Sequence, residues 1–156
     1  MFPSMRSEPL RYFEDIETGS RRLTERVEVT EAEILAFART YDPQPMHLDP
    51  EAAQRGLYGG LIASGWHTAA LVMGMVARAR PFGDAEVLGL GVEELEWPAP
   101  VRPGDTIQAE TEVVSARISR SKPAYGIVKV RITTRNQRGE VVMIHSPSCW
   151  VPRRPV

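Results

Sequence analysis

The sequence predicts an α+β fold in which one antiparallel β-sheet wraps around a single long, buried helix. Helix signals fill the first half of the chain, and β-rich runs with short turns fill the second half. A third observation joins the halves: residues 69–77, in the last helix, are apolar on nearly every side. A helix of that kind needs cover on most of its surface, and a curved sheet supplies that cover.

Bulk composition favours an ordinary globular protein. The 156 residues are 42% hydrophobic and 25% charged, with a net charge of −1, so we expect one domain over residues 1–156. This balance favours neither nucleic acid nor an acidic membrane as a partner. One cysteine, Cys149, makes no internal disulfide, and Met1–Glu8 lacks a signal-like apolar run. We therefore expect a reducing cytoplasm, and no apolar stretch is long enough to span a bilayer.

The first helix has clear start and stop signals. Thr30 with Glu33 three residues later forms a capping-box pattern, and apolar residues at helical spacing follow. The helix should end near Tyr41, because Pro43 and Pro45 cannot continue it.

Two further helices are expected. Asp49-Pro50-Glu51 places a capping residue before a proline at the first helical position, and Gly56 is a plausible stop. The turn at Gly59-Gly60 leads to the long apolar helix, which should run to about Arg80.

The remaining elements are strands. Runs rich in β-branched and apolar residues are separated by turn residues, and such short links favour antiparallel pairing. The expected strands are Arg22–Val29, Val87–Trp97, Thr106–Ala116, Tyr125–Thr134 and Val141–Val151. One sheet around one helix is the hot-dog arrangement, and such a half-covered sheet tends to pair with its own copy, so we expect a homodimer or dimer-based oligomer.

The segment between the first two helices holds a candidate acid–base pair. Asp42 and His47 lie five residues apart across two prolines, which stiffen the backbone between them. Histidine titrates near neutral pH, and a neighbouring carboxylate can orient it or share a water with it. The alternative is that Asp42 only ends the helix and His47 is a surface residue.

The same segment resembles the signature of MaoC-like (R)-specific enoyl-CoA hydratases. That signature runs Asp-x-Asn-Pro-x-His, five residues, then Ala or Ser, and Asp42, Pro45, His47 and Ala53 match it. Similarity extends over roughly residues 10–150 and includes Ala63-Ser64-Gly65 before the buried helix and the segment from Trp97 to Pro103-Gly104-Asp105.

The resemblance implies a site and a reaction. Asp42 and His47 would hold one water, add it to a trans-2-enoyl thioester and yield an (R)-3-hydroxyacyl thioester, or run the reverse. The backbone N–H of Gly65 would bind the thioester carbonyl, a role suited to a helix N-terminus. The substrate would be an acyl-CoA or acyl-carrier thioester, and the resemblance implies no cofactor and no metal.

Further residues are candidates for substrate binding. We expect Gln44 and Ser64 beside the catalytic pair, while Trp66 and His67 either line the substrate pocket or belong to the core. Arg120 and Lys122, near a hairpin turn, could meet coenzyme A phosphates or be solvated surface charges.

The sequence departs from the family pattern at three positions. Gln44 replaces the motif's asparagine, and Tyr41 replaces the small residue usually found before the aspartate. Met73 stands where some members have a serine that helps to hold the aspartate.

Two rival functions stay open at this stage. The first is an acyl-CoA thioesterase, because this fold hosts both chemistries. The second is a non-catalytic subunit that binds acyl thioesters. A metal site is disfavoured, because the histidines, Cys149 and the carboxylates lack ligand spacing. Ser64 is not in a nucleophile-elbow context.

Overall fold

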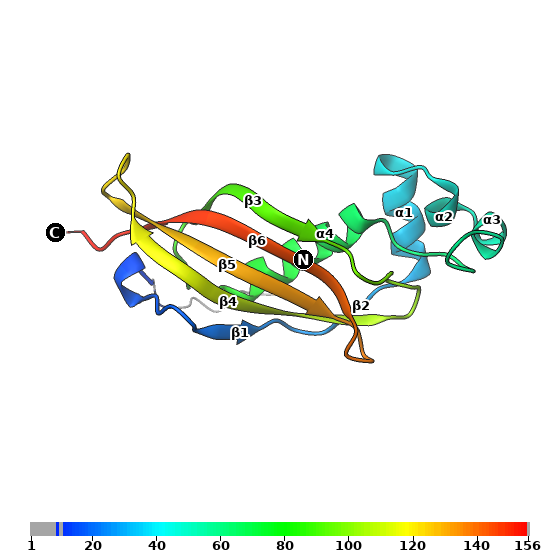
Figure 1. Cartoon of the computed structure of the whole chain (residues 1–156), viewed down its shortest axis with the longest axis horizontal. Helices are drawn as coiled ribbons and strands as arrows, with labels where there is room; N and C mark the ends of the chain where they lie inside the picture. Colours follow the sequence, from blue (N-terminus) through cyan, green and yellow to red (C-terminus); the bar gives the residue numbers. More distant parts are fainter. Residues whose placement is uncertain (1–8, 10, 156) are drawn as a thin grey trace.

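The computed structural model describes residues 9 and 11–155 of the chain. Its main sheet has the antiparallel strand order β1-β4-β5-β6-β3, and β2 pairs separately with β4 (Figure 1). The strands are β1 Arg21–Leu23, β2 Val27–Glu28, β3 Leu88–Glu96, β4 Thr106–Ile118, β5 Tyr125–Arg135 and β6 Val141–Pro152. A 3-10 turn, η1 Phe13–Asp15, precedes them, and the helices are α1 Glu31–Tyr41, α2 Pro45–Leu48, α3 Pro50–Gln54 and α4 Gly65–Ala79.

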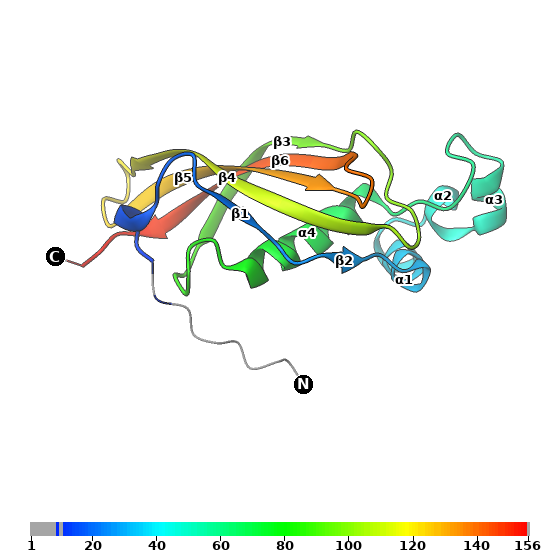
Figure 2. The ribbon, with the colours of Figure 1, turned by 90° about the horizontal axis from the view of Figure 1, so that it is seen from below.

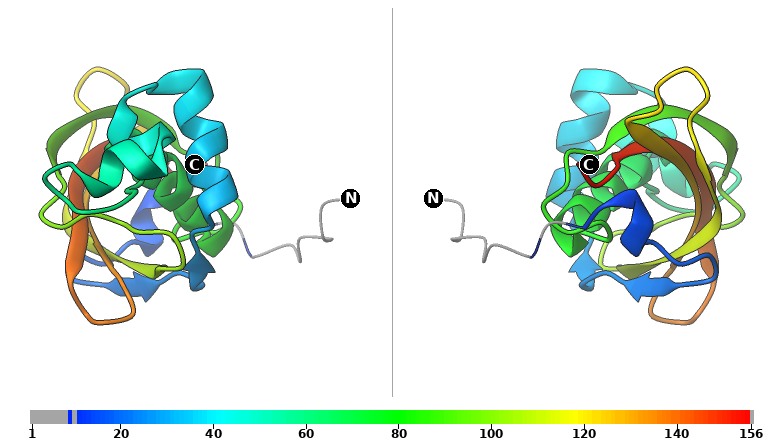
Figure 3. Two further views of the ribbon diagram at one scale, coloured as in Figure 1. Left: turned by 90° about the vertical axis from the view of Figure 1, so that its right-hand side faces the viewer. Right: turned by 90° about the vertical axis from the view of Figure 1, so that its left-hand side faces the viewer.

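Helix α4 lies along the concave face of the sheet (Figure 2). The end views show the strands curving around it (Figure 3). Val72 and Met75 of α4 are fully buried, and they belong to one apolar cluster with Ile107, Ile132 and Met143 from three strands. Burial of this apolar area is the main force that holds the helix against the sheet. The predicted hot-dog fold is thereby confirmed.

Burial of α4 is one-sided, whereas the sequence predicted that most of its surface is covered. Trp66 is 60% exposed and Met73 is 59% exposed, although both are large apolar side chains. The sequence pattern overstated burial, because one apolar stripe of the helix faces away from the sheet in a single chain.

The predicted strands agree with the structure, with one exception. Arg22–Val29 is two short strands rather than one. Between them, Thr24 accepts a hydrogen bond from the backbone N–H of Ala109 through its hydroxyl, at 3.0 Å. A side chain therefore replaces the backbone partner at this break, which periodicity alone does not reveal.

The helical region gathers at one end of the sheet, beside the start of α4 (Figure 1). The capping box of Thr30 and Glu33 is confirmed, and α1 ends at Tyr41 as predicted. The sequence did not predict α2. Pro45 does not lie in a loop after α1. It occupies the first turn of α2, where its missing N–H costs no hydrogen bond.

None of the helices in the described part of the chain is long and apolar enough to cross a membrane. The segment Met1–Glu8, in which we saw no signal-like run, lies outside the described residues.

The cap of α1 gives a prediction for stability. Replacing Thr30 with Ala removes the hydroxyl that accepts from the Glu33 N–H, so we expect unfolding in urea to need about 1 kcal/mol less free energy. Thr30→Ser keeps the hydroxyl and should match the wild type within a few tenths of a kcal/mol. Equal stability of all three proteins would contradict the cap assignment.

Candidate active site

Asp42 terminates α1 and points its carboxylate at two neutral donors. Its backbone N–H closes the helix on the carbonyl of Ala38, at 3.0 Å. The Ser64 hydroxyl donates to Oδ2 at 2.6 Å, and the Gln44 side-chain amide donates to Oδ1 at 2.7 Å. Each carboxylate oxygen thus has one fixed partner, which sets the plane of the group.

These hydrogen bonds favour the ionised carboxylate. The bond from Ser64, followed by the bond from Gln44, holds the pKa of Asp42 below its ordinary value, and the nearby His47 acts in the same direction. Asp42 is therefore an anion throughout the neutral pH range.

A backbone carbonyl fixes the orientation of the His47 ring through a hydrogen bond. Its Nδ1 lies 2.8 Å from the carbonyl oxygen of Ile62, which can only accept a hydrogen bond. In return the N–H of Ile62 donates to the Met46 carbonyl at 3.1 Å, so α2 and the segment before α4 are clamped together. The carbonyl assigns the proton of the neutral ring to Nδ1 and leaves a lone pair on Nε2.

The lone pair of His47 faces the carboxylate of Asp42. Nε2 and Oδ2 are 3.5 Å apart, and the side chains are 8% and 18% exposed. Both atoms can hydrogen-bond to one water placed about 2.8 Å from each. The two atoms can therefore share one water that lies to one side of the line joining them.

The N-terminus of α4 provides backbone donors at the same place. Ser64 is the N-cap, and its hydroxyl oxygen accepts from the Trp66 N–H at 3.2 Å while it donates to Asp42. The N–H of Gly65, at the first helical position, has no acceptor among the described residues. A free N–H at the positive end of a 15-residue helix suits a developing negative charge.

Gly65 is required for packing rather than for a turn. A Cβ at this position would lie 2.7 Å from the Cε2 atom of Trp97, closer than van der Waals contact permits. The indole of Trp97 packs directly against this glycine at the start of α4.

Two residues that we expected to bind substrate beside the acid–base pair, Gln44 and Ser64, both donate hydrogen bonds to Asp42. Ser64 is fully buried, and both its hydrogen bonds are within the protein. Gln44 donates its amide to Asp42. Ser64 also accounts for the departure at Met73. In this chain the serine that donates to the Asp42 carboxylate is the N-cap of α4, and position 73 inside the helix is not needed for that contact.

Trp66 and His67 have different surroundings. Trp66 is mostly exposed and meets Trp97 edge-on, with ring centroids 5.5 Å apart. His67 is buried and stacks on Phe37 of α1, with ring centroids 4.9 Å apart. Burial lowers the pKa of His67, and Glu33 opposes this change. His67 therefore belongs to the α1–α4 contact.

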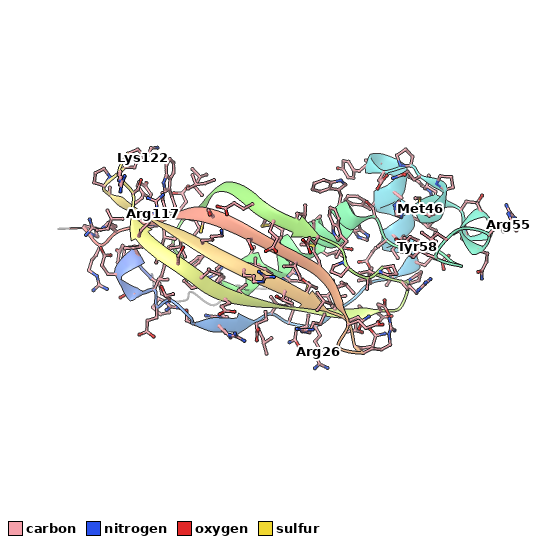
Figure 4. All side chains as sticks on the ribbon, in the orientation of Figure 1. Arg26, Met46, Arg55, Tyr58, Arg117 and Lys122 are labelled. Atoms are coloured by element: carbon pink, nitrogen blue, oxygen red, sulfur yellow. The ribbon has the colours of Figure 1, made fainter. Side chains whose placement is uncertain are left out.

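The structure does not bring Arg120 and Lys122 to the acid–base pair within one chain. They lie at the β4–β5 turn, at the opposite end of the sheet from Met46 (Figure 4). Lys122 is engaged there, with its ammonium 4.3 Å from the ring centroid of Trp150. A basic residue at the end of the sheet that carries the helices is Arg102, which donates to the Tyr58 carbonyl at 2.7 Å.

Sequence reasoning missed the backbone contribution to the site. The carbonyl of Ile62 fixes the His47 ring, yet any residue type supplies a carbonyl, so no sequence signal marks it. The role of Ser64 had a signal, because serine directly before an apolar helix is a typical N-cap.

Known proteins are similar to this chain in sequence and in fold. A crystal structure of a MaoC-like dehydratase from Rhodospirillum rubrum is 44% identical, covers 93% of this chain and 99% of its own, and superposes with a TM-score of 0.84. The (R)-specific enoyl-CoA hydratase of Rhodospirillum rubrum is 30% identical over 93% of this chain and 94% of its own length. The 3-hydroxybutyryl-CoA dehydratase of Methylorubrum extorquens is 32% identical over 72% of this chain and 68% of its own.

The match to the family is broad. Residues 14–136 fit the family described as MaoC like domain, and this range includes Asp42, His47 and Gly65. The chain therefore belongs to the MaoC-like domain family.

Proposed function

We propose that this protein is a hydro-lyase that reversibly adds water to a trans-2-enoyl-CoA-type thioester and gives an (R)-3-hydroxyacyl thioester. One observation supports this most strongly: Nε2 of His47 and Oδ2 of Asp42 lie 3.5 Å apart, close enough for both atoms to hydrogen-bond to one water. The relatives named hydratase and dehydratase support the same reaction class.

The addition uses three groups of the chain. His47 Nε2 takes a proton from the water as its oxygen bonds to the β-carbon of the thioester. The electron pair of the double bond moves toward the carbonyl oxygen, and the Gly65 N–H stabilises the enolate that forms. The imidazolium, held beside the Asp42 carboxylate, then returns the proton to the α-carbon, so the pair ends in its starting state.

Hydrogen bonds from neighbouring groups fix the different roles of Asp42 and His47. Asp42 stays ionised because Ser64 and Gln44 donate to it, so it stabilises the imidazolium formed during the reaction. Nδ1 of His47 donates to Ile62, so the lone pair of Nε2 faces the water. Neither residue needs a metal or a cofactor for these steps.

We also propose that the protein works as a homodimer. β3 is an edge strand, and Leu88, Leu90 and Val92 on it are exposed, as are Trp66 and Met73 on α4. An apolar edge strand beside an apolar helix stripe is a surface that a second copy can cover. The reducing cytoplasm remains our proposal for the compartment, and the free, buried Cys149 is compatible with it.

The first prediction from the proposed function concerns the acid–base pair. We expect Asp42→Asn and His47→Gln each to lower kcat/KM for enoyl-CoA hydration by at least about a hundredfold, because Asn lacks the negative charge and Gln lacks the basic nitrogen. The measurement is loss of the conjugated enoyl absorbance, with free thiol assayed in parallel.

Two outcomes contradict this proposal. Release of free thiol by the wild type at the rate of enoyl loss would identify a thioesterase. Full hydration by both variants would show that the pair is not catalytic. Arg39→Gln, an exposed change on α1 outside the pair, is the matched control and should keep the wild-type rate.

The second prediction concerns the pKa of Asp42. Ser64→Ala and Gln44→Met each remove a hydrogen bond that favours the carboxylate, so the pKa of Asp42 should rise toward its ordinary value. Titration of the Asp42 carboxyl carbon by ¹³C NMR should give a higher pKa in each variant than in the wild type. Gln44→Met leaves the α4 cap intact and separates this effect from helix stability. An unchanged pKa of Asp42 in both variants would contradict the assignment.

The third prediction concerns the dimer. Leu90→Lys and Val92→Lys place charges on the exposed edge strand, and we expect each to lower the solution mass to that of one chain while the circular dichroism stays unchanged. Val114→Lys, at an exposed position on β4, is the control and should leave the mass unaltered. A wild type of monomer mass would refute the proposal.

A further inference from the structure

Trp97, directly after β3, lies against the start of α4. Three atoms of its indole ring are 2.7, 2.8 and 3.1 Å from the place that a Cβ of Gly65 would occupy. The ring therefore fills the side of Gly65 on which any other residue would carry its side chain. Trp66, the next residue of the helix, meets the same ring edge-on, with ring centroids 5.5 Å apart. The indole thus contacts the first helical turn at the residue whose backbone N–H we assign to the thioester carbonyl.

Connections on both sides fix the backbone that carries Trp97. Before it, β3 ends at Glu96, which is paired with β6. After it, Pro98 disfavours helical geometry in the residue that precedes it. Further along, the Val101 carbonyl accepts a hydrogen bond from the Ala63 N–H at 2.8 Å. The sheet and the segment before α4 therefore set the position of the indole together.

Packing in the core does not account for this residue. Leu95 and Ala99, two positions before and after it, pack against the main apolar cluster, and Trp97 belongs to neither cluster of the described residues. Its side chain is 39% exposed, so part of its apolar surface gives no hydrophobic stabilisation in the single chain. Contact with Gly65 explains the indole better than burial does.

Two effects on the Gly65 N–H follow from this contact. The ring restricts movement of the first helical turn, so the N–H keeps its direction while the carbonyl oxygen gains charge. The ring also fills space from which water would compete for the N–H, and a hydrogen bond is stronger where water is excluded. Both effects favour the enolate over the bound thioester, because the charge on oxygen develops during the reaction. The contact should therefore raise kcat more than it lowers KM.

We propose that Trp97 is a positioning residue, which holds the Gly65 N–H toward the thioester carbonyl and shields it from water on one side. The inference rests on the proposed function, because it takes that N–H to bind the carbonyl. It also explains the glycine at position 65, since the indole and a side chain there exclude each other.

Kinetics of Trp97 variants give the first test. Trp97→Ala removes the ring, and we expect kcat for enoyl-CoA hydration to fall roughly tenfold or more while KM changes less than about threefold. Trp97→Phe keeps a flat ring against Gly65 and should recover most of the loss. Trp150→Ala, the matched control, deletes an indole opposite Leu88, at the other end of β3, and should keep the wild-type kcat. Circular dichroism checks that each variant is folded.

The exclusion between Gly65 and Trp97 gives a second test. Gly65→Ala keeps the N–H, but its Cβ displaces the indole, so we expect it to lower kcat as Trp97→Ala does. In the Trp97→Ala background the same substitution should cause no further loss, because the space is then vacant. Losses that multiply in the double variant would contradict the proposed coupling.

An unreactive thioester tests the inference without catalysis. Hexanoyl-CoA labelled with ¹³C at its thioester carbonyl has no double bond to hydrate, and a hydrogen bond to that carbonyl lowers its infrared stretching frequency. We expect a lowered frequency on binding to the wild type and to Trp97→Phe, and a smaller change with Trp97→Ala. No lowering with the wild type, or equal lowering with Trp97→Ala, would overturn the inference.

Together these measurements separate the two proposals. A carbonyl frequency that depends on Trp97, without any hydration of enoyl-CoA, would refute the proposed function and leave the action of Trp97 on the Gly65 N–H supported. Hydration with kcat and carbonyl frequency unaffected by Trp97→Ala would support the function and refute the inference.

Discussion

The hydrogen bond from Ser64 to Asp42 is the contact on which the site depends. It joins the C-cap of α1 to the N-cap of α4, so the carboxylate and the free N–H of Gly65 have a fixed relation. The same hydroxyl oxygen accepts from Trp66 and thereby completes the start of α4. One side chain thus sets the charge state of the anion, its orientation and the helix end beside it.

The fold places this contact at one end of the packed core formed by α4 and the sheet. Helix α4 is held by the sheet through Val72 and Met75, so its N-terminus projects from a well-packed core. The short helices α1–α3 are stacked on that end, and the clamp between Met46 and Ile62 ties them to the segment before α4. Preorganisation of this kind lets donors act on a developing charge without moving.

Sequence patterns predicted the larger features well. The four long strands, the ends of α1 and the start of α4 follow from periodicity, capping residues and prolines, which act locally. The same patterns did not predict features that depend on contacts between residues far apart in the sequence. Thr24 interrupts the first strand through its contact with Ala109, and one side of α4 is exposed because the sheet covers only the other.

The candidate site was predictable in part, for the same reason. Asp42 and His47 stand in one short motif, and Gly65 follows from the helix start. The long-range pairings join residues 22 apart, Asp42 with Ser64, and 15 apart, His47 with Ile62, so they could not be predicted without the fold. Arg120 and Lys122 show the converse: a basic turn has the right chemistry for phosphate, yet the topology places it at the other end of the sheet.

The central claim is that the water held by Asp42 and His47 attacks the β-carbon of an enoyl thioester. Turnover of a trans-2-enoyl-CoA in ¹⁸O-labelled water, with the product analysed by mass spectrometry, tests it directly. We predict that the label enters the 3-hydroxyl group of an intact thioester. Label found in a free carboxylate, with none at the β-carbon, would show attack at the thioester carbonyl and contradict the claim.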